Sequence, residues 1–110
     1  MKKIYRIKKN EEFNSIISKK HSLASACFVV YFLDKKLEHA RAGISVSKKL
    51  GDAVDRNKIK RQLRTMIVSL VDFENCQKDF IVIVRKPYLQ QEYKDNLSDL
   101  EKLFKKAIIV

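Results

Sequence analysis

Glycine, proline and cysteine are scarce in this sequence, and each scarcity excludes a class of protein. The 110 residues contain two glycines and one proline, too few for a flexible linker or a low-complexity tract. Cys27 and Cys76 form no disulfide framework, CxxC motif or Cys/His cluster, so we expect reduced thiols in the core. No apolar run is long enough for a signal peptide or a membrane span. We therefore expect one domain over residues 1–110, in the cytoplasm, without membrane association.

Catalytic motifs are also missing. The sequence has no Walker loop, no G-x-S-x-G motif and no zinc-ligand spacing. His21 and His39 fall in predicted loops and lack a recognisable catalytic partner. A nuclease that worked alone would need clustered carboxylates for metal ions, or histidines for acid and base chemistry. The sequence therefore predicts that the chain is not itself the catalyst and holds no metal ion alone.

Positive charge is what the sequence has in excess, with a net charge of +11 at pH 7 and a pI near 9.8. The excess is confined to two segments: residues 1–9 have a balance of +5 and residues 41–64 one of +6, whereas the two signs cancel elsewhere. Charge that serves only solubility would be spread more evenly. The localised excess indicates a surface that binds nucleic acid, anionic lipid or an acidic protein.

Apolar periodicity predicts three helices and three strands in the order α-β-β-α-β-α. Helical spacing predicts helices from an N-cap at Asn10 to about Lys19, over residues 53–70, and over residues 91–108. β-Branched and aromatic runs predict strands over residues 26–33, 40–47 and 79–86. We expect residues 34–40 to connect the first two strands as a hairpin, and the middle helix to be a crossover between parallel strands. The predicted fold is a small α+β domain with a mixed sheet.

The helix predicted over residues 53–70 has a basic face beside its apolar stripe. At about 100° per residue, Arg56 borders the stripe, and the polar residues that follow around the helix are Lys60, Arg64, Asn57, Arg61 and Lys58. A solvated helix face usually mixes charges of both signs, but no acid follows Asp55 until Asp72. Asp52 and Asp55 are interpreted as acids at the start of the helix. An ordinary solvated face remains the alternative to a face that binds an anionic partner.

Residues 45–64, SVSKKLGDAVDRNKIKRQLR, resemble the signature of the protein subunit of bacterial ribonuclease P. The segments KKNEEFNSII, FVVYFLD and FIVIVRKP resemble other parts of that family in the same order, so the resemblance covers nearly the whole chain. It implies the ribonuclease P protein fold, which is a ribosomal S5 domain 2-like fold. An extra short strand near residues 22–25 is compatible with this fold.

The resemblance implies an accessory subunit of an endoribonuclease. In that family the RNA subunit, with Mg²⁺ that it mainly binds itself, removes the 5′ leader from precursor tRNA. The protein binds the single-stranded leader and the ribonuclease P RNA, and no obligate protein partner is implied. The alternatives are a structural RNA-binding protein of the ribosomal type, a helix-turn-helix DNA binder and an autonomous metal-dependent nuclease. The strands predicted on both sides of the basic helix argue against the DNA binder.

The resemblance also assigns two surfaces. Contacts with the catalytic RNA are assigned to Lys48, Lys49, Arg56, Asn57, Lys58, Arg61 and Arg64. A leader-binding cleft between the first helix and the sheet is assigned to Phe13, Ile17 and Tyr31, with Arg56, Lys60, Arg85 and Lys86 expected at its rim. The alternatives are plain core packing for Phe13 and Tyr31 and a solvated strand end for Arg85 and Lys86. Two residues depart from the family pattern, because Lys58 lacks the bidentate fork of arginine and Ile17 cannot stack on a base.

The helical angles divide the basic helix between these two surfaces. Arg56 and Lys60 border the apolar stripe, so we expect them to lie near the sheet and the leader. Lys58 and Arg61 point further from the sheet, so we expect them to face the catalytic RNA.

Overall fold

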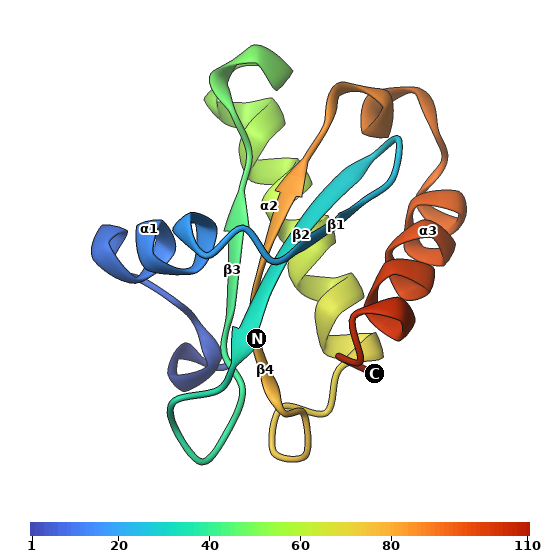
Figure 1. The fold of residues 1–110 in the computed structure, drawn as a ribbon. Coiled ribbons are helices and arrows are strands. Elements are labelled where there is room, and N and C mark those ends of the chain that lie inside the picture. The colour runs from blue at the N-terminus through green and yellow to red at the C-terminus, as the bar shows by residue number, and fades with distance from the viewer.

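The computed structural model describes residues 1–110 as a four-stranded mixed sheet with helices on both faces (Figure 1). The strands are β1 Ser22–Ala24, β2 Phe28–Asp34, β3 Ala42–Ser45 and β4 Lys78–Val84. The α-helices are α1 Asn10–Ser18, α2 Ala53–Leu70 and α3 Tyr93–Lys106, and the short 3-10 helices are η1 Lys3–Tyr5, η2 Lys48–Leu50 and η3 Lys86–Gln90. The predicted α+β class, the mixed sheet and the order of the six predicted elements are confirmed, and β1 is the additional short strand.

The predicted hairpin between the first two long strands is wrong. The strand order is β1-β2-β4-β3, so β4 lies between β2 and β3 and pairs with β2 antiparallel and with β3 parallel. The antiparallel hairpin joins β1 to β2 instead, and Ser25 shapes its turn by accepting hydrogen bonds from the backbone N–H groups of Cys27 and Phe28. The parallel pair β3-β4 is connected through α2, which confirms the predicted crossover.

The central position of β4 follows from its sequence. Phe80, Val82 and Val84 alternate with Ile81 and Ile83, so the strand is apolar on both faces. A strand of this kind is most stable where neighbours satisfy both of its backbone edges and other elements cover both of its faces. β3 has four residues and occupies the edge of the sheet.

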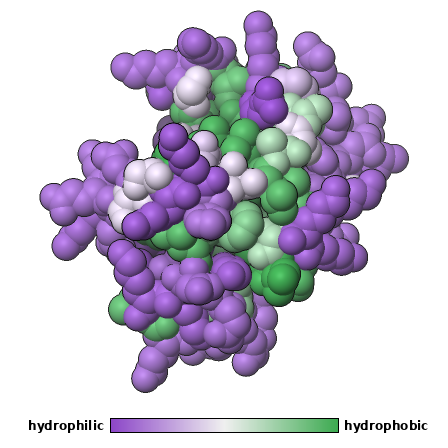
Figure 2. Space-filling view, viewed as in Figure 1, coloured by the Kyte–Doolittle hydropathy of each residue, from purple (hydrophilic) through white to green (hydrophobic).

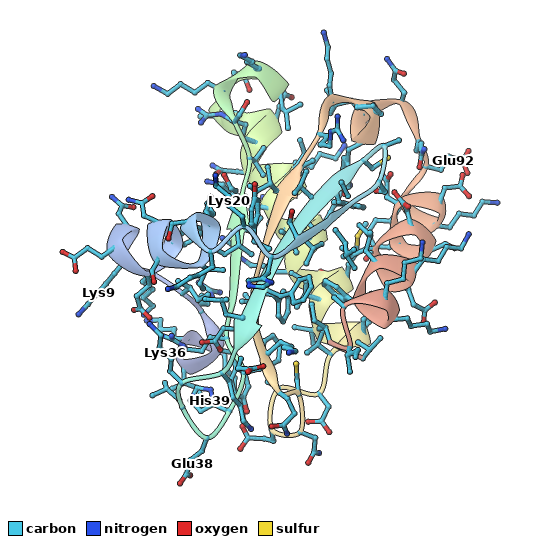
Figure 3. All side chains as sticks on the ribbon, in the orientation of Figure 1. Lys9, Lys20, Lys36, Glu38, His39 and Glu92 are labelled. Atoms are coloured by element: carbon cyan, nitrogen blue, oxygen red, sulfur yellow. The ribbon has the colours of Figure 1, made fainter.

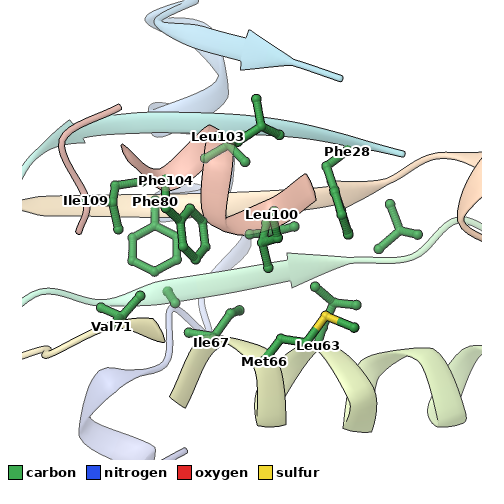
Figure 4. Packing of buried hydrophobic residues seen from close by; sticks show 14 of the residues in the cluster. Phe28, Leu63, Met66, Ile67, Val71, Phe80, Leu100, Leu103, Phe104 and Ile109 are labelled. Carbon is green, nitrogen blue, oxygen red and sulfur yellow. The ribbon is translucent and has the colours of Figure 1, made fainter. Parts of the chain in front are cut away.

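The main core fills the space between one face of the sheet and the helices α2 and α3 (Figure 4). Phe80 and Phe104 meet edge to face with ring centroids 5.1 Å apart, and Leu63, Met66 and Ile67 form the buried stripe of α2. Both cysteines are buried and unpaired, as the sequence predicted. The apolar stripe that fixes the rotation of α2 therefore belongs to the largest cluster in the molecule.

The capping residues predicted at the N-termini of the helices are confirmed at α2 and wrong at α1. At α2 the side chain of Asp52 accepts a hydrogen bond from the Asp55 backbone N–H at 2.9 Å, and Asp55 reciprocates at 3.4 Å, which forms a capping box. These two acids thus stabilise the start of α2, as expected. At α1 the prediction of Asn10 as N-cap is wrong: Asn10 is the first helical residue, Lys9 is the N-cap, and no side chain caps the helix.

The C-terminus of α3 ends in a Schellman motif that places a strained residue in solvent. Ile109 N–H donates to the Phe104 carbonyl at 2.9 Å, and Ile108 N–H donates to the Lys105 carbonyl at 3.2 Å. Ile108 lies at φ 58°, in the left-handed region, and its side chain is exposed. A β-branched residue is unfavourable in this conformation, which glycine adopts without a steric cost.

We predict that Ile108→Gly stabilises the protein by about 1 kcal/mol, because it removes left-handed strain at a position that buries no side chain. Urea denaturation followed by circular dichroism measures the change in the free energy of unfolding. Ile108→Ala is the matched control, since it removes the same exposed side chain but keeps a Cβ atom. Equal stabilities of the Ala and Gly variants would contradict the role of strain.

Candidate nucleic-acid interface

The face of the sheet opposite the main core is only partly covered. Strand register places Tyr31, Ile81 and Gly43 side by side in one row, and Val29, Ile83 and Ser45 side by side in the next. α1 packs over the first row, where Ile81 is fully buried, whereas Val29, Ile83 and Ser45 remain partly exposed. We call Val29, Tyr31, Ser45 and Ile83 the open sheet face. Figure 2 shows apolar surface, in green, next to α1 and bordered by hydrophilic side chains.

Phe13 of α1 lies directly against the backbone of β3. A Cβ atom added to Gly43 would come within 2.6 Å of Cζ of Phe13, closer than real side chains approach. Glycine at this position therefore allows the tip of the ring to approach the backbone of the edge strand. Ile16 is buried against the sheet, and Phe13 and Ile17 pack beside it while remaining partly exposed. Phe13, Ile17 and Tyr31, which the resemblance assigned to the cleft, thus gather in one apolar cluster.

A buried ion network attaches α1 to the sheet. Arg41 forms ion pairs with Glu12 of α1 and with Asp79 of β4, whose side chain is only 2% exposed. Asp79 also accepts a hydrogen bond from the Arg41 backbone N–H at 2.9 Å. Burial would lower the pKa of Arg41, but the hydrogen bonds that its guanidinium donates to Glu12 and Asp79 outweigh this effect and raise the pKa. The guanidinium therefore stays charged and fixes α1 in place.

The cations of α2 have no acidic partner. The ion pairs of the structure involve Arg41, Lys78 and Lys94, and none involves the five cations of α2. Those cations are exposed or half-buried: Arg56, Lys58, Lys60, Arg61 and Arg64. Unpaired cations on one helix repel one another, and an anion bound among them would remove that repulsion. The basic face predicted from the helical angles is therefore present and available to a ligand.

The basic face of α2 meets α1 at the β3 edge of the sheet. A cavity of about 140 Å³ there is lined by Phe13 and Gly43 on one side and by Lys60 and Arg64 on the other. Lys60 thus lies beside the apolar cluster, as its helical angle predicted. Arg64 borders the same cavity, although the resemblance assigned it to the catalytic RNA. Arg56 lies one turn before Lys60 on this side and is half-buried.

The other residues that were predicted to bind RNA lie on several elements around this cavity. Lys48 and Lys49 are exposed in η2, just before α2, and Asn57 and Arg61 are exposed on α2. Arg85 follows Ile83 by two positions, so it extends the open sheet face, and its side chain donates to the Ser25 carbonyl at 3.0 Å. Lys58 lies on the other side of α2, at a separate cavity between α2, η3 and α3. Lys86 begins η3 and is exposed.

The second basic segment of the sequence lies next to α1. Lys2, Lys3, Lys8 and Lys9 are exposed, and Figure 3 shows Lys9 and Lys20 at the two ends of α1. Arg6 of this segment lines the cavity shared by Phe13, Lys60 and Arg64, whereas Lys2 lines another cavity with Val68 and Asp72 at the C-terminal end of α2. The segment therefore borders the region between α1 and α2 only in part. No group of three or more histidine, cysteine or acidic side chains is arranged to hold a metal ion, and no helix has the length and apolar character of a membrane span.

Three residues of the open sheet face were not identified from the sequence. Val29 precedes Tyr31 by two positions, so strand alternation alone could have placed it on the same face. Ile83 and Ser45 carry no comparable signal, because their position beside Val29 depends on the pairing of three strands.

We predict that Gly43→Ala displaces the Phe13 ring and costs about 1–3 kcal/mol in the free energy of unfolding, because the added methyl group overpacks the contact. A crystal structure of the variant shows the ring position, and urea denaturation gives the stability. In a Phe13→Leu background the same substitution should cost less, since the smaller side chain leaves room. Additive effects of the two substitutions would show that Gly43 and Phe13 do not interact.

Comparisons with known proteins agree with this geometry. The ribonuclease P family model matches residues 1–108. The ribonuclease P protein component of Bacillus mycoides is 48% identical over 108 residues, which cover 97% of this chain and 94% of the relative. The counterpart from Bacillus anthracis is 46% identical, with 97% and 91% covered.

Solved structures agree in fold. The ribonuclease P protein of Staphylococcus aureus superposes with a TM-score of 0.83 at 45% identity, covering 96% of each chain. The ribonuclease P protein from Thermotoga maritima gives a TM-score of 0.78 at 28% identity, covering 92% of this chain and 96% of the other. From the match along nearly the whole sequence and from the shared fold, this chain belongs to the ribonuclease P protein family, the accessory protein subunits of the endoribonuclease that processes the 5′ end of tRNA.

Proposed function

We propose that this chain holds the 5′ leader of precursor tRNA between α1 and the open sheet face. A single-stranded leader offers unstacked bases and a charged backbone. Tyr31 and Phe13 supply aromatic surface for the bases, and stacking of this kind contributes about 1–3 kcal/mol per base. Lys60, Arg56 and Arg64 supply charge for the phosphates along one edge, and Arg85 and Lys86 supply it near the end of β4. The observation that carries the proposal is the position of Phe13, which belongs to one apolar cluster with Tyr31 and shares a cavity with Lys60 and Arg64.

The outer side of α2 is proposed to bind the RNA subunit. Lys48, Lys49, Asn57, Lys58 and Arg61 are exposed there and form no ion pair. Arginine offers a planar fork for phosphate oxygens, and asparagine can donate to phosphate or ribose and accept from a 2′-hydroxyl group. Lys58 is expected to bind phosphate more weakly than the arginine usual at this position in the family, because lysine contacts phosphate as a point charge and not through a bidentate fork.

In this proposal the RNA subunit performs the hydrolysis, and the protein contributes affinity and position. Mg²⁺ is bound mainly by the RNA in this scheme. Cations on α2 and in η2 lower the repulsion between the RNA subunit and its substrate, so less Mg²⁺ is needed for the two RNAs to associate. The reaction takes place in the cytoplasm in this scheme, and no further protein is required.

Reconstitution tests the function directly. This protein is added to a bacterial ribonuclease P RNA at low Mg²⁺ concentration with precursor tRNA that carries a labelled 5′ leader. We predict release of the leader only when protein and RNA are both present. Cleavage by the protein alone would make it an autonomous nuclease. Tight RNA binding without any stimulation of cleavage would favour the structural RNA-binding alternative.

A pair of substitutions on α2 tests the division between the two RNAs. We predict that Lys60→Ala reduces the preference for long-leader over short-leader precursor tRNA by about two- to tenfold, the loss of one charge-assisted phosphate contact. Arg61→Ala should weaken binding to the RNA subunit and leave that preference unchanged. Each variant removes one cation from the same helix, so each serves as the charge-matched control of the other. A Lys60→Ala variant that impairs holoenzyme assembly alone would contradict the division.

A further inference from the structure

A second cavity of the molecule lies away from the open sheet face. It occupies about 430 Å³ between the first half of α2, η3 and the start of α3. The residues that define its chemistry are Lys58, Gln62, Tyr88, Leu89, Tyr93 and Asn96. Of these residues only Lys58 has a role in the proposed function, so the cavity is a feature that the proposed function leaves unexplained.

Hydrogen bonds hold the walls of this cavity in a fixed arrangement. The Tyr88 hydroxyl donates to Oε1 of Gln62 at 2.7 Å, and Nδ2 of Asn96 donates to the Tyr88 carbonyl at 3.1 Å. Burial raises the pKa of Tyr88, so the phenol remains a hydrogen-bond donor across the neutral range. Because Oε1 of Gln62 accepts from Tyr88, the orientation of the amide is set, and Nε2 is left to donate to a ligand.

Asn96 supplies an acceptor that nothing in the protein satisfies. The residue is 2% exposed, and its Oδ1 atom is buried without a hydrogen-bond partner. A buried acceptor in this state costs about 1–3 kcal/mol. An N–H group of a ligand in the cavity would satisfy it after a small shift of the side chains that now cover Oδ1. The cavity therefore offers one donor and one unsatisfied acceptor on neighbouring walls.

The mouth of the cavity adds an aromatic surface and a positive charge. Tyr93 is 40% exposed and Leu89 is 51% exposed, although both are large apolar side chains. Lys58 lies on the α2 side, and it is exposed. Asp55 also lines the cavity, but its carboxylate accepts from the Asp52 backbone N–H in the capping box. An aromatic face, a donor, an acceptor and a cation are together the chemistry that recognises an unstacked nucleotide.

We infer that this cavity binds a single unpaired nucleotide of the ribonuclease P RNA, with its base against Tyr93 and its phosphate beside Lys58. The inference rests on the proposed binding of the RNA subunit to α2. RNA is favoured because Lys58 continues, through Asn57 and Arg61, into the unpaired basic face of the helix. A nucleotide held there would fix the rotation of the protein on the RNA, which phosphate contacts alone fix less specifically.

The test is chemical probing of a bacterial ribonuclease P RNA at nucleotide resolution, with and without the intact protein. Dimethyl sulfate reports the base edges, and 2′-hydroxyl acylation reports nucleotide flexibility. We expect the wild-type protein to protect one unpaired nucleotide that Tyr93→Ala leaves reactive, with affinity for the RNA about tenfold weaker. Tyr93→Phe keeps the ring and should restore the protection. Ser98→Ala, an exposed change on the same helix, is the control and should behave as wild type.

A second variant keeps the test independent of folding defects. Gln62→Glu retains an acceptor for the Tyr88 hydroxyl but removes the donor toward the cavity, so we expect the same nucleotide to become reactive. If Tyr93→Ala and Gln62→Glu both bind the RNA with every protection intact, the inference is overturned while the proposed function stands. If the wild-type protein fails to bind the RNA at all, the proposed function fails and the inference fails with it.

Discussion

Arg41 connects α1 to the sheet, and the geometry of the proposed leader site depends on this buried ion network. A helix of nine residues has little stability of its own, so tertiary contacts must hold it. The apolar packing around Ile16 and Ile81 stabilises the contact but does not by itself set the orientation of α1. The ion pairs of the Arg41 guanidinium with Glu12 and Asp79 set that orientation, because they require a defined geometry. Loss of the Arg41 side chain would leave the buried Asp79 carboxylate with its backbone hydrogen bond but no cation beside it, at a cost of several kcal/mol.

The two faces of the sheet serve different purposes. One face is sealed by α2 and α3 and contains the large aromatic and aliphatic residues that stabilise the fold. The other is covered by α1 alone, so apolar residues such as Val29 and Ile83 stay within reach of a ligand. Exposed apolar area of this kind adds nothing to the stability of the free protein, and a leader bound as proposed would cover it. α2 contributes to both regions, because its apolar stripe builds the core while Lys60 and Arg64 border the cavity beside α1.

The sequence was sufficient where the signals are local. The bounds of α2 follow from two capping acids and an uninterrupted apolar period, and its basic arc follows from helical angles. Strand order was not predictable in this way, because residues 34–40 resemble a hairpin connection and nothing local shows that β4 inserts between β2 and β3. The cavity around Tyr88 and Asn96 is built by three elements whose proximity no spacing in the sequence reveals.

The shared use of α2 by the core and by the basic face restricts how the chain can change in length. Insertion or deletion of one residue between Ile59 and Leu63 would rotate the rest of the helix by about 100°, turning Arg64 and the residues after it out of register with the sheet. Addition of seven residues leaves a drift of only about 20°, so related chains can lengthen α2 in pairs of turns. Single-residue length differences should instead accumulate in the connections at residues 35–39 and 72–77, which lie at the far end of the sheet from the cations of α2.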